Sequence, residues 1–221
     1  MLSKDIYTFF SELEQNNHRE WFTDHKTRFK ALEAEVKALG ESIVSELQSS
    51  DQVEKMKLFR VYRDVRFSKD KTPYKTHFGM AFHRLKPEYR GGYYIHLKPG
   101  DSFLAVGFWD PNKEDLLRIR KEIDMDASEF REILRDKTLQ NLWGNLTGDE
   151  VKTAPKGFSK EHPDIDLIKK KQYLFIRKLS EKEVFSPQLE QTVVESFRAI
   201  RPFFNYMSSV LTTDLNGESL L

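Results

Sequence analysis

The sequence contains no cysteine, which excludes disulfide bonds, thiolate metal sites and a cysteine nucleophile. No apolar run approaches the roughly 18 residues of a membrane-spanning helix, and the N-terminus lacks the apolar segment of a signal peptide. A net charge of only +1 provides no general attraction to nucleic acid or to a membrane. We therefore expect a cytoplasmic protein without a membrane partner.

The 221 residues include 17 phenylalanines, and 38% of all residues are hydrophobic. A chain of this length and composition can bury a large core, which argues against disorder. No internal repeat or low-complexity linker divides the sequence. We therefore predict one domain that spans residues 1–221.

The spacing of apolar residues changes along the chain from a helical period to a period of two and back. Asn17 and Glu20 resemble a capping box, and the apolar stripe that follows predicts one continuous helix to Leu47. The predicted order is helical segments at 1–50, strands within 57–110, mixed elements at 112–178 and helices at 186–213. We predict an α+β domain whose central antiparallel or mixed sheet is packed by the N- and C-terminal helices, because regular βα alternation is missing.

The clearest hairpin signal joins Tyr93–Leu97 to Phe103–Trp109 through a turn that contains proline and glycine. Asp110, Pro111 and Asn112 then predict the start of a helix.

One segment, residues 59–77, carries six cations and two acids, a net charge of +4 with histidine neutral. Basic charge is therefore local in a nearly neutral chain. The alternation of Phe59, Val61, Val65 and Phe67 predicts a strand, which Ser68–Pro73 ends as a turn.

These cations predict a site for an anion, because arginine presents a planar fork of donors that fits carboxylate or phosphate. Asp64 and Asp70 can hold cations in position, and Tyr74 can donate a hydrogen bond or stack on a base. The alternative is a salt-bridge network that ties a strand to a loop, but the excess of four charges favours a site. The predicted anion-binding residues of this segment are Arg60, Arg63, Asp64, Arg66, Lys71, Tyr74 and Lys75.

A second basic group, Lys152 and Lys156 with His162, lies in a loop that contains proline and glycine. It is either an ordinary surface loop or, if it folds against residues 60–75, part of the same pocket.

Three histidines, His77, His83 and His96, could bind a metal together with an aspartate, but the sequence lacks the HxH, HExxH and HxxxH spacings. We therefore predict no metal. His96 is instead a possible general base or a packed histidine. No P-loop, dinucleotide fingerprint or nucleophile elbow is present, and no cofactor is predicted.

The run Arg60–Thr76 resembles the signature of an uncharacterised family known as domain of unknown function 2461. The matching positions in this run are Arg60, Arg63, Asp64, Arg66, Phe67, Asp70, Lys71, Tyr74 and Thr76. Further matching pieces are Asn16-Asn17 with Trp21-Phe22, Gly92-Tyr93-Tyr94 with His96, and Lys152 with Pro155–Phe158 and His162-Pro163. The resemblance covers nearly the whole chain and implies neither a reaction nor catalytic residues.

Three functions remain open from the sequence. The first is a module that binds a phosphate-bearing ligand, a nucleotide or a nucleic acid. The second is an enzyme for a small acidic substrate, with Asp64 or His96 as the base and the arginines stabilising negative charge. The third is a structural or interaction protein whose charges pair internally, with Arg63 against Asp64 or Asp70.

Overall fold

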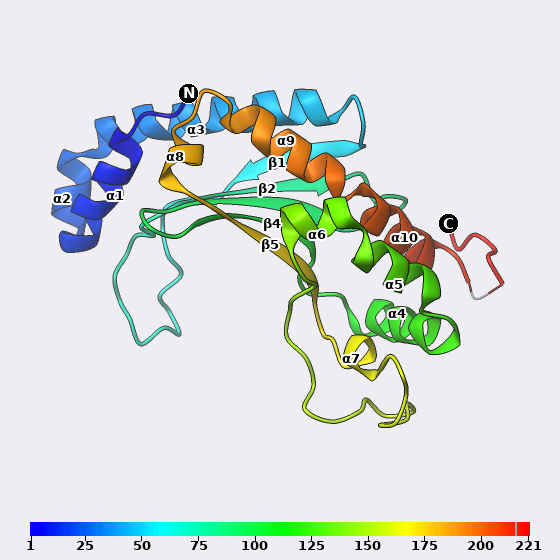
Figure 1. Cartoon of the computed structure of the whole chain (residues 1–221). Helices are drawn as coiled ribbons and strands as arrows, with labels where there is room; N and C mark the ends of the chain where they lie inside the picture. Colours follow the sequence, from blue (N-terminus) through cyan, green and yellow to red (C-terminus); the bar gives the residue numbers. More distant parts are fainter. Residues whose placement is uncertain (215) are drawn as a thin grey trace. The chain divides into compact units, whose positions relative to one another are not determined.

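The computed structural model describes residues 1–214 and 216–221. It contains a five-stranded antiparallel sheet in which neighbouring strands follow one another in chain order (Figure 1). The strands are β1 (Val53–Leu58), β2 (Phe78–Arg84), β3 (Gly92–Leu97), β4 (Ser102–Phe108) and β5 (Tyr173–Leu179). The predicted α+β fold class is confirmed.

The described residues form ten helices, which precede, interrupt and follow the run of strands. They are α1 (Asp5–Gln15), α2 (Arg19–Asp24), α3 (Lys26–Leu47), α4 (Lys113–Met125), α5 (Ser128–Arg135), α6 (Lys137–Trp143), α7 (Ile165–Ile168), α8 (Glu181–Val184), α9 (Leu189–Ala199) and α10 (Arg201–Thr212). Within the described ranges, no helix is long and apolar enough to cross a membrane.

The hairpin and the helix start predicted from local signals are both present. Strands β3 and β4 lie within one residue of the predicted limits. Asn112 caps α4, since its side chain accepts a hydrogen bond from the backbone N–H of Asp115 at 2.8 Å.

The prediction of one continuous helix from Asn17 to Leu47 is wrong, because the chain breaks at His25 between α2 and α3. The imidazole of His25 stacks on Trp21 with ring centroids 4.0 Å apart, and its Nδ1 lies 2.8 Å from the Trp21 carbonyl oxygen. Such a local side-chain contact competes with helical hydrogen bonding. The cap of α2 is His18, which accepts from the Trp21 N–H, and Asn17 has another role described below.

The chain divides into two compact units. The first unit comprises residues 1–82, 94–104 and 178–194, and the second comprises residues 83–93, 105–177 and 195–221.

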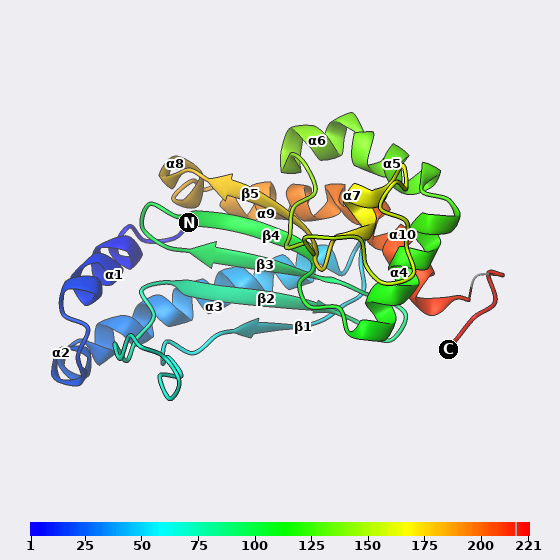
Figure 2. The same ribbon diagram turned by 90° about the horizontal axis from the view of Figure 1, so that it is seen from below.

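In the first unit, α1 and α3 cover one face of the strands. Phe78 of β2 packs against Phe10 of α1 and Phe29 of α3, with ring centroids 4.8 and 5.6 Å away. Because side chains alternate along a strand, Tyr94 and His96 of β3 project from the opposite face. Figure 2 views the strands of this unit from that opposite face, with α3 behind them.

The second unit has an aromatic core of its own. Phe130 of α5 stacks on Tyr206 of α10 with centroids 5.1 Å apart and contacts Phe203 at 6.1 Å. Arg84 is buried in this unit, with its guanidinium 4.7 Å from the centroid of Phe204 and a hydrogen bond to the carbonyl of Arg90. This contact supplies a cation–π interaction and a polar partner for a charge that is removed from water.

Candidate functional site

Residues 59–77, which we call the basic loop, connect β1 to β2 in the first unit and project away from α1 and α3 (Figure 1). The predicted strand from Phe59 to Phe67 is wrong. Only one bridge, between Tyr62 and Tyr74, closes the loop. Hydrogen bonds from Arg63 N to Pro73 O (2.9 Å) and from Lys75 N to Val61 O (2.8 Å) flank this bridge. We call residues 59–62 and 73–77 the neck of the loop and residues 63–72 its tip.

Beyond this neck, hydrogen bonds from side chains to the backbone replace the backbone hydrogen bonds of a strand pair. The carboxylate of Asp64 accepts from the backbone N–H of Arg66, that of Asp70 accepts from Thr72, and Lys71 Nζ donates to the carbonyl of Val65. These bonds hold the backbone in turns and compete with strand pairing. Phe67, which the alternation assigned to an apolar face, is 97% exposed.

Asn17 attaches the neck to the N-terminal helices. Its amide nitrogen donates to Tyr74 O at 3.0 Å, and its amide oxygen accepts from Tyr74 N at 3.1 Å. The Tyr74 ring is buried and stacks on Phe22 with centroids 4.1 Å apart. Burial raises the pKa of the Tyr74 hydroxyl. Tyr74 therefore has a packing role, and its ring face is not available to a base.

Two of the three arginines form internal ion pairs in the tip of the loop. Arg63 pairs with Asp70 and also donates to the carbonyl oxygen of Thr72 at 3.1 Å. Arg66 forms a forked pair with Asp64, at 3.0 Å from Nε and 2.7 Å from Nη2. The bond from the Thr72 N–H, and then that from Arg63, lower the pKa of Asp70 to about 2.

The pair with Arg66 has a consequence for Asp64. It lowers the pKa of that carboxylate, which is exposed to solvent. A carboxylate already held by a guanidinium is a weak base, so the geometry does not favour Asp64 as the base of a reaction.

The positive excess of the segment resides in four other cations. Within residues 1–214 and 216–221, no ion pair is formed by Arg60, Lys69, Lys71 or Lys75. Two of these four, Arg60 and Lys75, lie in the neck. The ammonium group of Lys75 is 5.5 Å from the centroid of the Phe59 ring, and that of Lys57, the neighbouring lysine of β1, is 5.3 Å from it. We call Lys57, Arg60 and Lys75 the cation cluster.

The cation cluster is electrostatically unfavourable for the protein by itself. Burial lowers the pKa of Lys75, and the positive charges of Arg60 and Lys57 lower it further. Like charges that approach each other repel and disfavour the charged form. The charge of Arg60 also acts on Asp64 and lowers the pKa of that carboxylate, but the two do not form an ion pair. An anion bound among the three cations would remove the repulsion between them.

Beside the cation cluster, the face of the sheet opposite α3 carries a group of partly exposed rings. We call Phe59, His77, Tyr94, His96 and Phe103 the aromatic cluster. The rings of His77 and His96 are 4.1 Å apart, and His96 stacks on Phe103 at 4.6 Å with an interplanar angle of 12°. Phe59 lies 6.3 Å from Tyr94 and connects this cluster to Lys57 and Lys75.

Tyr94 orients His96. Its hydroxyl oxygen lies 3.0 Å from His96 Nδ1, and its ring leans across the neighbouring strand at Gly79. A Cβ at Gly79 would lie only 2.6 Å from the Tyr94 hydroxyl oxygen. Glycine at this position therefore allows the tyrosine to lie over β2 and reach the histidine.

Both histidines of the aromatic cluster are neutral at pH 7. Burial is the main cause that lowers the pKa of His77 and His96 to about 4. The charge of Lys98 acts in the same direction on both, whereas Asp101 raises the pKa of His96. Asp101 also pairs with Lys178.

The sequence singled out His96, Arg60 and Lys75, but neither Lys57 nor the aromatic cluster as a unit. His77, Tyr94 and Phe103 belong to three different strands or their ends, so no sequence spacing brings them together. The alternation in β3, which places Tyr94 and His96 on the same face, was the available signal.

The second predicted basic group belongs to the second unit. Lys152 and Lys156 are exposed there. His162 instead precedes α7, where its Nδ1 accepts from the Asp164 N–H at 3.0 Å and its Nε2 lies 3.6 Å from Asp124. Their contribution to anion binding stays a prediction.

The part of the chain that the structure describes contains no set of side chains that could bind a metal ion. Within it, no three histidine, aspartate or glutamate side chains converge closely enough to hold an ion.

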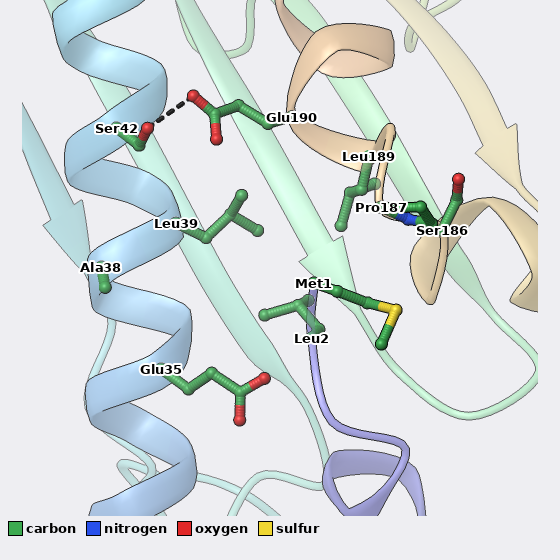
Figure 3. A pocket seen from close by; sticks show the side chains of 10 residues that line it. All are labelled: Met1, Leu2, Glu35, Ala38, Leu39, Ser42, Ser186, Pro187, Leu189 and Glu190. Atoms are coloured by element: carbon green, nitrogen blue, oxygen red, sulfur yellow. Dashed lines mark hydrogen bonds between the residues drawn. The ribbon is translucent and has the colours of Figure 1, made fainter.

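A pocket of about 300 Å³ lies elsewhere in the first unit, between α3, the N-terminal residues and the start of α9 (Figure 3). Met1, Leu39 and Leu189 line it together with two carboxylates, Glu35 and Glu190. Glu190 accepts a hydrogen bond from Ser42 Oγ, and Glu35 accepts one from Ser3 N. Carboxylates repel an anion, so this pocket does not match the predicted ligand class.

Comparison with known families identifies one match. Residues 5–206 match the family described as conserved hypothetical protein (DUF2461). No curated protein and no solved structure matches the chain.

Proposed function

We propose that this chain, which belongs to the DUF2461 family, binds an anionic, phosphate-bearing ligand, a nucleotide or a nucleic acid, at its cation cluster. One observation carries the proposal. Lys57, Arg60 and Lys75 gather around the neck of the basic loop, and no described acid forms an ion pair with any of them. Their mutual repulsion costs stability, which a bound phosphate would offset.

The residues predicted from the sequence differ in how directly they would contact the ligand. Arg60 and Lys75 contact the ligand directly. Lys71 stands at the tip, where its ammonium also bonds the Val65 carbonyl. Arg63, Asp64 and Arg66 shape the tip through their ion pairs. Tyr74 positions the neck by packing. A part for Lys152 and Lys156, which belong to the second unit, stays a prediction from the sequence.

Titration calorimetry with inorganic tripolyphosphate and with ATP, at 50 and 200 mM salt, tests the proposal. The Arg60→Gln, Lys75→Gln double variant removes two unpaired cations, and we expect its affinity for both probes to fall about tenfold or more. The affinity of the unaltered protein should also fall as salt rises, because charges at this surface are screened.

Arg66→Gln is the matched control. Arg66 lies in the same loop and is more exposed, but its charge is already neutralised by Asp64. We expect its affinity to stay within about threefold of the original. Equal losses in Arg66→Gln and in the double variant, or no binding of either probe, would contradict the proposal and leave the internally paired, structural interpretation.

A second candidate function is an enzyme that acts on a small acidic substrate with His96 as the base. The observation that favours it is the contact between Tyr94 Oη and His96 Nδ1, which orients an imidazole beside the cations. Its lowered pKa leaves His96 neutral and able to accept a proton at pH 7, although as a weak base.

Hydrolysis of p-nitrophenyl phosphate and bis(p-nitrophenyl) phosphate tests this second candidate. His96→Gln should abolish turnover, while tripolyphosphate affinity changes by less than about threefold. If the unaltered protein turns over neither compound, or if His96→Gln retains full activity, this assignment of His96 is refuted.

A further inference from the structure

The aromatic cluster differs from a hydrophobic core because its rings are partly exposed to solvent. On the helix-facing side of the sheet, Phe78, Met80 and Ile95 are buried. On the opposite side, the rings of Tyr94, His96 and Phe103 remain partly exposed. Partly exposed rings that contact one another on a sheet face are the kind of surface on which proteins receive unpaired bases.

The aromatic and cation clusters are joined through Phe59. The ammonium groups of Lys57 and Lys75 lie 5.3 and 5.5 Å from the centroid of the Phe59 ring. The centroids of the Phe59 and Tyr94 rings are 6.3 Å apart. A nucleotide has the same arrangement, because one sugar connects its phosphate to a planar base. A phosphate on Lys57, Arg60 and Lys75 would therefore have its base beside the rings.

The two histidines add hydrogen-bonding capacity to the ring surface. A neutral imidazole offers one donor and one acceptor. The Tyr94 hydroxyl already engages Nδ1 of His96, and within residues 1–214 and 216–221 no partner is found for His96 Nε2. This nitrogen can serve the polar edge of a base.

The surrounding charge is also complementary to a nucleotide. Lys98 and Lys178 lie near His96, and Lys178 Nζ is 5.1 Å from the centroid of Phe103. The nearby acid, Asp101, is itself paired with Lys178. Because this pair neutralises Lys178, Lys98 is the cation near His96 that could contact a further phosphate of a nucleic-acid chain.

We propose that the aromatic cluster binds the unpaired base of a nucleotide whose phosphate lies on the cation cluster. This inference rests on the proposed function and names its ligand class. It excludes duplexes, because paired bases are stacked inside a double helix and cannot reach the rings.

Fluorescence anisotropy and calorimetry with five probes test the inference. The probes are tripolyphosphate, ATP, CTP, a 12-nucleotide single-stranded RNA or DNA, and the matching duplex. We expect ATP to bind at least fivefold more tightly than tripolyphosphate, and the single strand more tightly than the duplex. Phe103→Leu removes a ring and keeps apolar volume, and it should weaken nucleotide binding by about 5- to 100-fold, the range that a lost stacking contact gives. Tripolyphosphate affinity should not change.

Phe67→Leu is the matched control, because Phe67 is a fully exposed ring in the same basic loop. It should leave all affinities unchanged. Phe59→Leu provides a second ring variant, and thermal melting establishes that each variant folds.

Each outcome has one meaning. If the single strand and the free nucleotides differ in affinity by more than tenfold, the tighter binder shows whether the site takes a nucleic acid or a free nucleotide. Tighter binding of the single strand and tighter binding of the nucleotide both support the inference. Equal affinity for tripolyphosphate and ATP, equal binding of duplex and single strand, or a loss in Phe67→Leu rather than Phe103→Leu overturns the inference but leaves the proposed function standing. Failure of every probe overturns both.

Discussion

The tip and the neck of the basic loop contain the same kinds of residue but arrange their charges in opposite ways. In the tip, Arg63 and Arg66 each contact an aspartate. At the neck, the ammonium groups of Lys57 and Lys75 lie near the Phe59 ring, and the charge of Arg60 acts on Lys75. None of these three cations forms an ion pair within the described residues. The paired arginines of the tip thus support the fold, whereas the cations at the neck repel one another. Cations that a fold does not use for itself are the better candidates for ligand binding.

The largest expected effect is a pH dependence of stability that arises beside the neck, in the aromatic cluster. The pKa values of His77 and His96, about 4 in the folded protein, lie below the unfolded value near 6.5. Between these values the unfolded chain binds more protons, so the free energy of unfolding should decrease as pH falls from about 6.5 to about 4. Because both rings are partly exposed, we expect about 2 kcal/mol for the pair.

The groups that face these histidines come from several segments. His96, Lys75 and Lys98 face His77. Tyr94, Lys98, Asp101 and Lys178 face His96. Urea unfolding at pH 4.5, 5.5 and 6.5 measures the effect, and the His77→Gln, His96→Gln double variant should lose this part of the slope. His18→Asn is the control, since His18 is an exposed histidine and asparagine can still cap α2. Parallel pH profiles for the protein and the double variant would refute the prediction.

In the tip, Arg63→Gln should destabilise the protein by about 1–2 kcal/mol, because Asp70 and the Thr72 carbonyl lose a charged donor. This corresponds to a decrease in Tm of roughly 2–8 °C for a chain of this size. Lys69→Gln, which removes an exposed charge without an ion pair, should change Tm by less than about 2 °C. Similar melting of both variants would show that the tip pairs contribute nothing.

At the attachment of the neck, Asn17→Ala removes both hydrogen bonds to the backbone of Tyr74. We expect a loss of about 1 kcal/mol or more, since the amide and carbonyl of Tyr74 lose their partner. Asn16→Ala is the comparison, because Asn16 donates one bond to the Glu12 carbonyl at the end of α1. Hydrogen exchange of the Tyr74 amide should accelerate in Asn17→Ala alone, and an unchanged rate would contradict this role.

The smallest expected effect is an increase in stability, whereas the preceding changes decrease it. Lys75→Gln should stabilise the protein slightly, by up to about 0.5 kcal/mol, because it relieves repulsion from Arg60 and Lys57. Thermal melting at low salt measures this gain, which should diminish at 0.5 M salt as the charges are screened. A variant that melts lower than the original protein would show that Lys75 supports the fold, and the contrast between tip and neck would no longer hold.

Much of the fold was predictable because its signals are local. The alternation in Tyr93–Leu97 and the turn that follows specify a hairpin wherever the strands lie, and Asn112 caps a helix through residues three positions away. The same reasoning failed at Phe59–Phe67, where the apolar alternation is real but side-chain bonds from Asp64, Asp70 and Lys71 hold the backbone in turns.

The sequence by itself determined the fold class, the family and the excess of four positive charges in one segment. Only the tertiary structure decided which cations are neutralised, because pairing depends on distances through space: Arg63 reaches Asp70, while Lys75 lies near the Phe59 ring and the charge of Arg60. It also buried Tyr74 under Phe22 and brought His77 against His96. Periodicity is a property of neighbours in the chain, whereas desolvation and charge repulsion are properties of neighbours in space.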